Sequence, residues 1–171
     1  AIIQSITAFY LQDTFSLSIL VTQQSLGIAL GFMALTSIVA QLTIVQKIKT
    51  HPIRLVQWST PFFIIGTLVA VSADNFIIYV FGMSIIGLGM GLGTPGYTAA
   101  ASLNADSESQ GAAVGLAMVA PGLGFSIGPL LGGFLYEASP VLPFLIILPI
   151  FALVFLIASY ISKSKLAEKT L

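Results

Sequence analysis

Three glutamines stand inside otherwise apolar parts of the chain, namely Gln4, Gln23 and Gln24. Burying an amide in hydrocarbon costs free energy unless the amide finds a hydrogen-bond partner. We therefore expect these side chains to face other parts of the protein or a wet cavity. Two interpretations stay open: the amides form hydrogen bonds between helices, or they contact polar groups of a small-molecule substrate.

Met90, Met118 and Phe125 lie in glycine-rich apolar stretches. Because methionine is flexible and polarisable, surfaces rich in it adapt to partners of different shape. Together with the glutamines, these three residues are candidates for the wall of a substrate cavity. Ordinary packing between helices is the alternative explanation for each of them.

The chain offers little for catalysis or metal binding. It contains 0 cysteines and 1 histidine, which excludes thiol catalysis and Cys-ligated zinc and leaves few ligands for a transition metal. A membrane-embedded enzyme needs paired carboxylates or a similar polar constellation within its apolar segments, and these segments contain none. A net charge of +0 gives no electrostatic reason to expect a nucleic-acid partner. We expect a protein that is not an enzyme and uses no metal or cofactor.

The uncharged segment 111–136 combines many glycines with two prolines. In water these residues oppose a helix, since Gly costs about 1 kcal/mol and Pro about 3 kcal/mol relative to Ala. In a bilayer, neighbouring helices satisfy the backbone groups that proline leaves free, and small residues let helices approach closely. The segment therefore predicts a bent, closely packed transmembrane helix. Helical spacing gives it two thin stripes, one of Gly111, Gly115, Gly122, Ser126, Pro129 and Gly133, the other of Ala120, Gly124, Gly128 and Gly132.

The composition indicates a membrane protein throughout. Hydrophobic residues make up 57% and charged residues 7% of the 171 residues, against about 25% charged in soluble domains. A helix that crosses a bilayer needs about 20 mostly apolar residues. We predict an all-α polytopic bundle over residues 1–171, with a partial helix at 1–12, complete helices at 16–45, 55–73, 76–102, 111–136 and 141–161, and a tail at 162–171.

Basic residues set the orientation of such a bundle, because they stay on the cytoplasmic side. Lys47, Lys49 and Arg54 lie between the first two complete helices, and more lysines follow the last helix. The joints that fall on the other side carry Asp13, Asp74 and Glu137. We expect a multi-pass protein of the plasma (inner) membrane with a cytoplasmic carboxy-terminus. The basic residues set topology and contact anionic lipid, or they gate the cytoplasmic mouth; Tyr10 and Asp13 are expected at the outer interface.

The spacing of Gly115, Gly124, Gly128-Pro129 and Gly132-Gly133 resembles the antiporter motif of the major facilitator superfamily, most closely its drug:proton antiporter branch. That motif is described for the fifth helix of the family, and related patterns recur in the eleventh. The basic loop 41–54 lacks the Gly and Asp of the family's loop between helices two and three, and the chain ends in a short basic tail. Both features favour the carboxy-terminal six-helix half, with a truncated seventh helix followed by helices eight to twelve.

The resemblance implies a secondary active transporter that works by alternating access. Helices seven, eight, ten and eleven are then expected to line the cavity, with nine and twelve outside. The implied function is proton-coupled efflux of drugs or other small molecules, and an uptake carrier for a sugar, organic acid or other metabolite is the alternative. The implied partners are a small-molecule substrate, protons, the lipid bilayer and the missing amino-terminal half. An accessory membrane protein is a further alternative. The Gly-Pro motif either lets the halves tilt or only packs helices closely.

Overall fold

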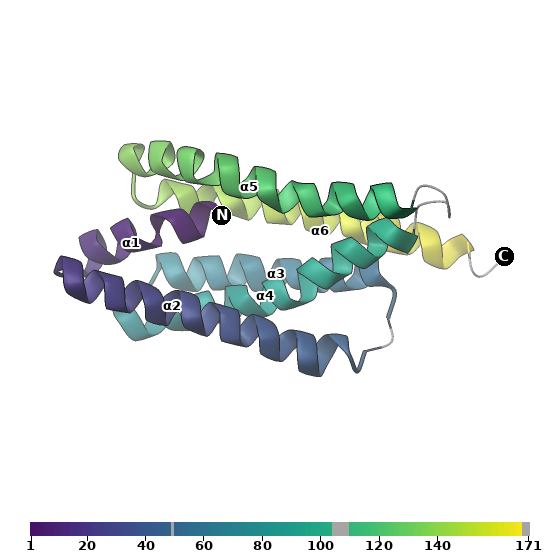
Figure 1. Ribbon diagram of the computed structural model, residues 1–171, viewed down its shortest axis with the longest axis horizontal. Helices are drawn as coiled ribbons and strands as arrows, with labels where there is room; N and C mark the ends of the chain where they lie inside the picture. The colour runs from purple at the N-terminus through teal and green to yellow at the C-terminus, as the bar shows by residue number, and fades with distance from the viewer. Residues whose placement is uncertain (49, 104–109, 169–171) are drawn as a thin grey trace.

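The computed structural model describes residues 1–48, 50–103 and 110–168. These residues form six α-helices and one π-helical turn, joined by short connections. Figure 1 shows the helices lying side by side along one long axis. The all-α fold class is therefore confirmed. The elements are α1 (Ile2–Phe15), α2 (Ile19–Ala40), η1 (Gln41–Val45), α3 (Pro52–Val71), α4 (Phe76–Leu103), α5 (Gln110–Ala138) and α6 (Leu142–Glu168).

Five of these helical segments are long and apolar enough to cross a membrane. They are Ile19–Val45, Pro52–Val71, Phe76–Leu103, Gln110–Ala138 and Leu142–Lys163. The remaining helix, α1, has 14 residues. At about 1.5 Å per residue it is only about 21 Å long, so it covers part of the length of the bundle (Figure 1).

Several helix limits differ from the expected ranges. α1 runs on to Phe15 and α2 begins at Ile19 rather than at 16, because Ser16 takes a left-handed conformation that ends α1. α3 begins at Pro52 rather than at 55, because proline suits the first turn of a helix and the His51 ring accepts a hydrogen bond from the Ile53 amide. α6 continues to Glu168, so the expected tail at 162–171 begins as a continuation of this helix. The residues after Ile161 include no Gly or Pro, which are the residues that most strongly oppose a helix.

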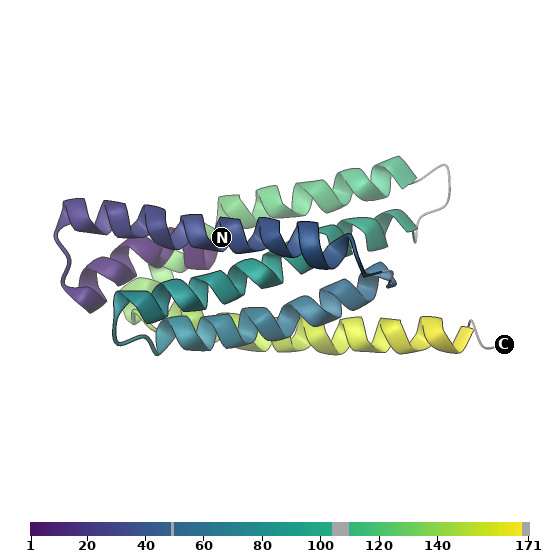
Figure 2. The same cartoon turned by 90° about the horizontal axis from the view of Figure 1, so that it is seen from below.

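The helices form layers that are visible in Figure 2. There α2 and α5 run along one edge of the bundle and α3 and α6 along the opposite edge, with α1 and α4 between them. α4 is the central helix because its glycines let both neighbours approach. A Cβ atom at Gly82 would lie 2.6 Å from the Ala70 nitrogen of α3. On the α2 side, the Thr36 hydroxyl donates a 2.8 Å hydrogen bond to the Ser84 carbonyl.

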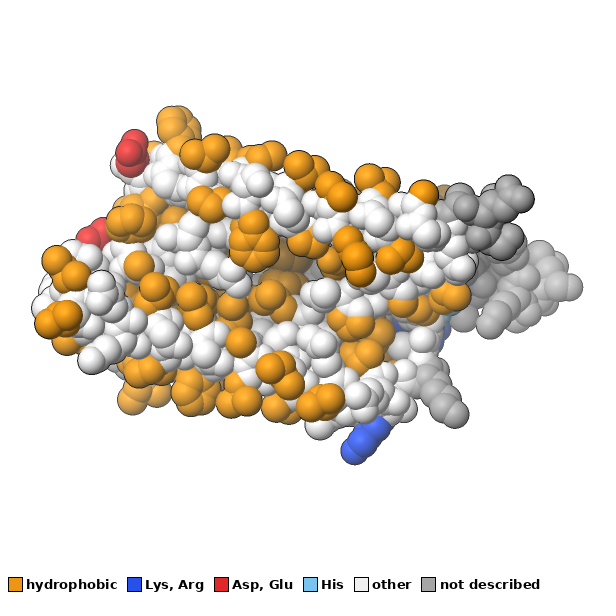
Figure 3. Space-filling model, viewed as in Figure 1, with side chains coloured by type: hydrophobic (Ala, Val, Ile, Leu, Met, Phe, Trp, Pro, Cys, Tyr) orange, Lys and Arg blue, Asp and Glu red, His pale blue; other side chains and the backbone are white. Residues whose placement is uncertain are grey.

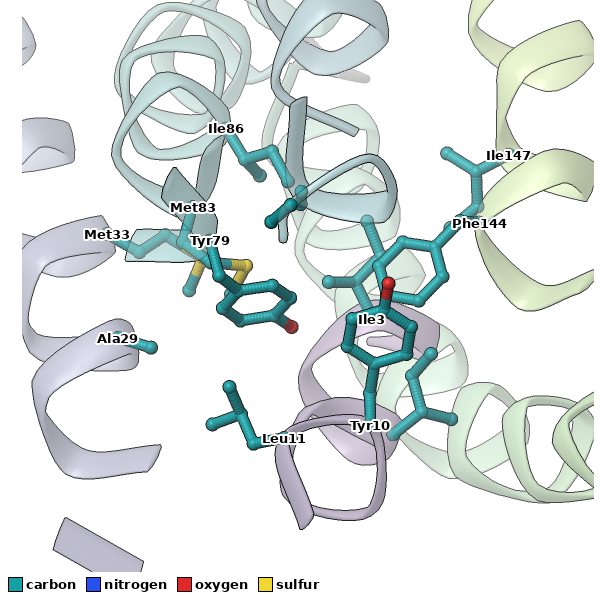
Figure 4. Packing of buried hydrophobic residues seen from close by; sticks show 13 residues of the cluster. Ile3, Tyr10, Leu11, Ala29, Met33, Tyr79, Met83, Ile86, Phe144 and Ile147 are labelled. Carbon is teal, nitrogen blue, oxygen red and sulfur yellow. The ribbon is translucent and has the colours of Figure 1, made fainter. Parts of the chain in front are cut away.

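A cluster of buried residues lies where α1, α4 and α6 meet (Figure 4). Tyr10 and Tyr79 stack with ring centroids 5.5 Å apart, and the edge of Tyr10 meets Phe144 at 4.8 Å. The Tyr79 hydroxyl donates to the Thr7 hydroxyl at 3.2 Å, and Tyr10 donates to the Val71 carbonyl at 3.1 Å. Tyr10 is only 3% exposed, so it belongs to the core of the bundle, and its expected depth near the outer interface stays a prediction.

Charged side chains gather at the two ends of the bundle. Figure 3 shows acidic side chains at the end where α5 meets α6 and basic side chains at the opposite end, with hydrophobic side chains over the face between them. Large exposed hydrophobic residues occur on every long helix. Such a surface is suited to hydrocarbon between two polar boundaries.

Candidate functional site

A cavity of about 670 Å³ lies between α5 and the helices that face it. It begins at the amino-terminal end of α1, where Ala1 and Gln4 are part of its wall. None of the described side chains that line it is charged. Its other lining residues are Ile2, Ile3, Met33, Phe63, Ile86, Met90, Thr94, Tyr97, Pro121, Leu123, Gly124, Phe125, Ile127, Gly128, Leu131, Ile147, Ile150 and Phe151.

One face of α4 supplies a wall of this cavity. Ile86, Met90, Thr94 and Tyr97 follow one another at intervals of four, four and three residues, which places them on one side of a helix. Thr94 and Tyr97 add hydroxyl groups to an otherwise apolar wall. Of these four residues, the sequence analysis named only Met90. Thr94 and Tyr97 could also have been expected, because they follow Met90 at helical spacing.

The floor of the cavity consists of aromatic residues from the helices that were expected to lie outside. Phe63 of α3 and Phe151 of α6 stack with ring centroids 4.2 Å apart and planes 7° apart. The family resemblance places helices nine and twelve outside the transport cavity, and both contribute side chains to the cavity seen here.

The structure brings together three of the six candidate substrate residues. Gln4, Met90 and Phe125 line the cavity. The other three, Gln23, Gln24 and Met118, are exposed and do not line it. The side chains that α2 buries are Thr22, Ser25, Ala29, Met33 and Ala40. Since successive residues of a helix point about 100° apart, the two glutamines of α2 turn away from this buried face.

The Gly-Pro motif divides into a packed part and an open part. Gly128 and Gly132 are buried against α1, where a Cβ atom would lie 2.6 Å from the Ala1 Cβ and 2.9 Å from the Ser5 Oγ, respectively. A Cβ atom at the motif's remaining glycines, Gly115, Gly124 and Gly133, would meet nothing within 4 Å. Pro121 and Pro129 lie inside α5, which stays helical through both.

The charged candidates lie away from the cavity. Lys47 is exposed and Arg54 is half-buried, and neither lines it; Lys49 lies outside the described residues. At the other end of the bundle, the Tyr136 hydroxyl donates a 2.7 Å hydrogen bond to the Asp13 carboxylate. No group of three residues able to hold a metal ion occurs in the described part of the chain.

Comparison with known proteins gives one informative result. No curated protein matches this chain. The family model described as Major Facilitator Superfamily matches residues 1–170, nearly the whole sequence. That match agrees with the five membrane-spanning helical segments and with an apolar cavity inside their bundle. The chain belongs to the Major Facilitator Superfamily of membrane transporters.

Proposed function

We propose that this membrane transporter exports drugs or other small molecules in exchange for protons, and that the chain is its carboxy-terminal half. One observation carries the proposal: an uncharged cavity between membrane helices, one wall of which is the helix with the antiporter-like glycines. Pockets for small molecules are mostly apolar with a few placed polar groups. Gln4, Thr94 and Tyr97 supply such groups here.

An amino-terminal half is proposed to cover the edge formed by α2 and α5. These two helices lie along the same edge in the view of Figure 2, while Figure 1 shows them on opposite sides of the bundle. A Cβ atom at Gly27 or Gly31 of α2, or at Gly115 or Gly122 of α5, would meet nothing within 4 Å. Small residues in membrane helices are typical of close helix contacts, which supports a second bundle packed against these positions.

Proton coupling is proposed to depend on that other half. Proton relays use ionisable side chains inside the membrane. In the described helices the ionisable carboxylates, among them Asp13 and Glu137, stand at helix ends or joints. A titrating residue that couples transport to protons is therefore expected outside this chain.

The basic residues support an orientation in the plasma (inner) membrane. Lys47, Lys49 and Arg54 are proposed to lie on the cytoplasmic side, as is the carboxy-terminus, because basic residues resist translocation. Contact of these residues with anionic lipid headgroups follows from the same placement.

Accumulation of a fluorescent cationic dye tests the function. Cells that express the full-length gene are expected to hold less dye than cells with an empty vector, and a proton uncoupler should raise their dye content to the vector level. Equal dye content with and without expression, across several apolar dyes, would reject export. Faster uptake of a labelled sugar or organic acid in the same cells would instead support the uptake carrier.

A further inference from the structure

α3 and α6 form a close antiparallel pair. Near the basic end of the bundle, the Gln57 amide of α3 donates a 3.1 Å hydrogen bond to the Ser159 hydroxyl of α6. Further along the pair, Phe63 stacks on Phe151. Between these two contacts the residue numbers rise along α3 and fall along α6, so the helices run in opposite directions. Both lie along one edge of the bundle in Figure 2, which leaves one side of the pair facing outwards.

The exposed residues of α3 form a single stripe on this outer side. They are Trp58, Pro61, Ile65 and Leu68. Steps of three and four residues keep them on one side of the helix. Phe63, which lines the cavity, is two residues from Ile65 and therefore points to nearly the opposite side of α3. The stripe is thus turned away from the cavity and towards lipid.

α6 carries a matching stripe. It consists of exposed residues at the same steps of three and four, namely Leu153, Leu156, Tyr160 and Lys163. The residue that follows each partner of the Gln57–Ser159 bond is aromatic. In antiparallel helices, the residues that follow two contacting positions turn towards the same side of the pair. Trp58 and Tyr160 therefore lie on one outer face, and apolar side chains of both helices continue from them.

Each stripe ends in a cation at the basic end of the bundle. Arg54 precedes Trp58 by four residues, and Lys163 follows Tyr160 by three. Because the helices are antiparallel, both cations lie about one turn beyond the aromatic pair, on the same outer face. The carboxylates whose side chains the structure describes stand at the opposite end of the bundle, and they are Asp13, Asp74 and Glu137. The two positive charges therefore border an apolar face without a described carboxylate that neutralises them.

We propose that this outer face binds one phospholipid with a negatively charged head group. The phosphate of the lipid lies between Arg54 and Lys163, since cations clustered at the membrane surface attract anionic lipids. Trp58 and Tyr160 lie at the depth of the glycerol region, which amphipathic aromatic rings prefer, and the acyl chains follow the two stripes. A free phosphate ion would leave the rings and the stripes unused, so the complementary partner is a lipid.

The fluorescence of Trp58, the single tryptophan of this chain, tests the inference. The full-length transporter, with phenylalanine in place of any tryptophan outside this chain, is placed in vesicles of phosphatidylcholine and phosphatidylglycerol. Only the anionic phosphatidylglycerol carries bromine, a quencher, on its acyl chains. Since one cation near the surface contributes about a fivefold preference for anionic lipid, quenching should indicate at least about fivefold enrichment over the mole fraction. Brominated phosphatidylcholine in the reciprocal mixture should quench less than its mole fraction predicts.

Substitutions of the cations identify the site. Arg54→Gln and Lys163→Gln should each lower the preference by about fivefold, and Arg54→Lys should keep most of it. Lys163 is exposed, so its variant decides the matter if Arg54→Gln fails to fold. Lys47→Gln is the matched control, because Lys47 is an exposed cation outside both stripes, and it should keep the full preference.

Three results would overturn the inference. One is quenching in proportion to mole fraction in the unsubstituted protein. Another is an equal loss of preference in Lys47→Gln, which would indicate general attraction to a charged surface. The third is displacement of the lipid by inorganic phosphate but not by sodium chloride of equal ionic strength, which would indicate a site for free phosphate. The readout does not involve transport, so a protein that exports no dye contradicts the proposed function alone.

Discussion

The hydroxyl group of Tyr136 donates a 2.7 Å hydrogen bond to the carboxylate of Asp13, joining residues 123 positions apart. It ties the last turn of α5 to the last turn of α1. At the other end of α1, Ala1 and Ser5 lie against the two buried glycines of α5. α5, which lines the cavity, thus contacts α1 through a hydrogen bond at one end and through closely packed glycines at the other.

Removing the Tyr136 hydroxyl should destabilise the protein modestly. Tyr136→Phe is expected to lower the free energy of unfolding by about 1 kcal/mol, because the exposed bond to Asp13 exchanges with water. Asp13→Asn should act in the same direction, and the double variant should lose less than the sum of the two. Chemical unfolding in detergent measures this, with Tyr160→Phe as control, since Tyr160 is 78% exposed. Additive losses would show that the two side chains do not interact.

The buried pair Thr7 and Tyr79 should respond unequally to substitution. Thr7→Val keeps the shape of the side chain but leaves the Tyr79 hydroxyl, which donates to it at 3.2 Å, without its acceptor. Its cost is expected at about 1–3 kcal/mol, above the cost of about 1 kcal/mol for Tyr79→Phe. Thermal unfolding of both variants and of the pair checks this order. If Tyr79→Phe proves the more harmful, ring packing rather than the hydrogen bond dominates.

A methyl group at Gly87 should separate α2 from α4. A Cβ atom there would collide with the backbone carbonyl of Met33 and the hydroxyl of Thr36. Gly87→Ala is therefore expected to cost about 1–3 kcal/mol. At Gly93 the nearest atom is the Ser59 hydroxyl oxygen at 3.0 Å, which can rotate away, and the Ser59 Cβ lies at 3.3 Å, so only a small shift is needed. Gly93→Ala should be clearly milder in the same unfolding measurement; equal losses would refute the role of the backbone contact.

A bulky residue at Gly128 should stop transport. A Cβ atom there already lies 2.6 Å from the Ala1 Cβ and 3.2 Å from the Ile2 nitrogen, so Gly128→Leu forces α5 away from α1. Dye export per folded molecule, normalised by size-exclusion chromatography, is expected to fall at least about tenfold, which corresponds to about 1.4 kcal/mol. Gly128→Ala should show an intermediate loss. Normal export by the leucine variant would mean that this contact has no part in transport.

Cysteine labelling tests the orientation, since this chain contains 0 cysteines of its own. In a cysteine-free full-length protein, Asp74→Cys should react with a membrane-impermeant thiol reagent added to intact cells. Lys47→Cys should react only after the membrane is opened, because basic residues stay on the cytoplasmic side. The two variants control each other. The reverse pattern would invert the topology.

The approximate positions of the membrane helices could be predicted from the sequence, and the rotation of each helix could not. A bilayer demands a minimum apolar length, so uninterrupted runs such as 76–102 and 111–136 correspond closely to α4 and α5. These helices are apolar on every side, and a helix of that kind has no amphipathic pattern to indicate its buried face. For this reason the sequence did not indicate which side of α2 carries Gln23 and Gln24, and these glutamines, expected to face protein or a wet cavity, are exposed on the surface of this chain.

The amino-acid sequence by itself determined the class of the protein: a helical membrane bundle with its charges at the two ends, because hydrophobic length and the placement of Lys and Arg act locally along the chain. The tertiary structure alone decided which residues meet. It buried Tyr10 against Tyr79 and Phe144, paired Tyr136 with Asp13, and placed Phe63 and Phe151 under the cavity. Such contacts depend on how the surfaces of several helices fit together, which no single segment encodes.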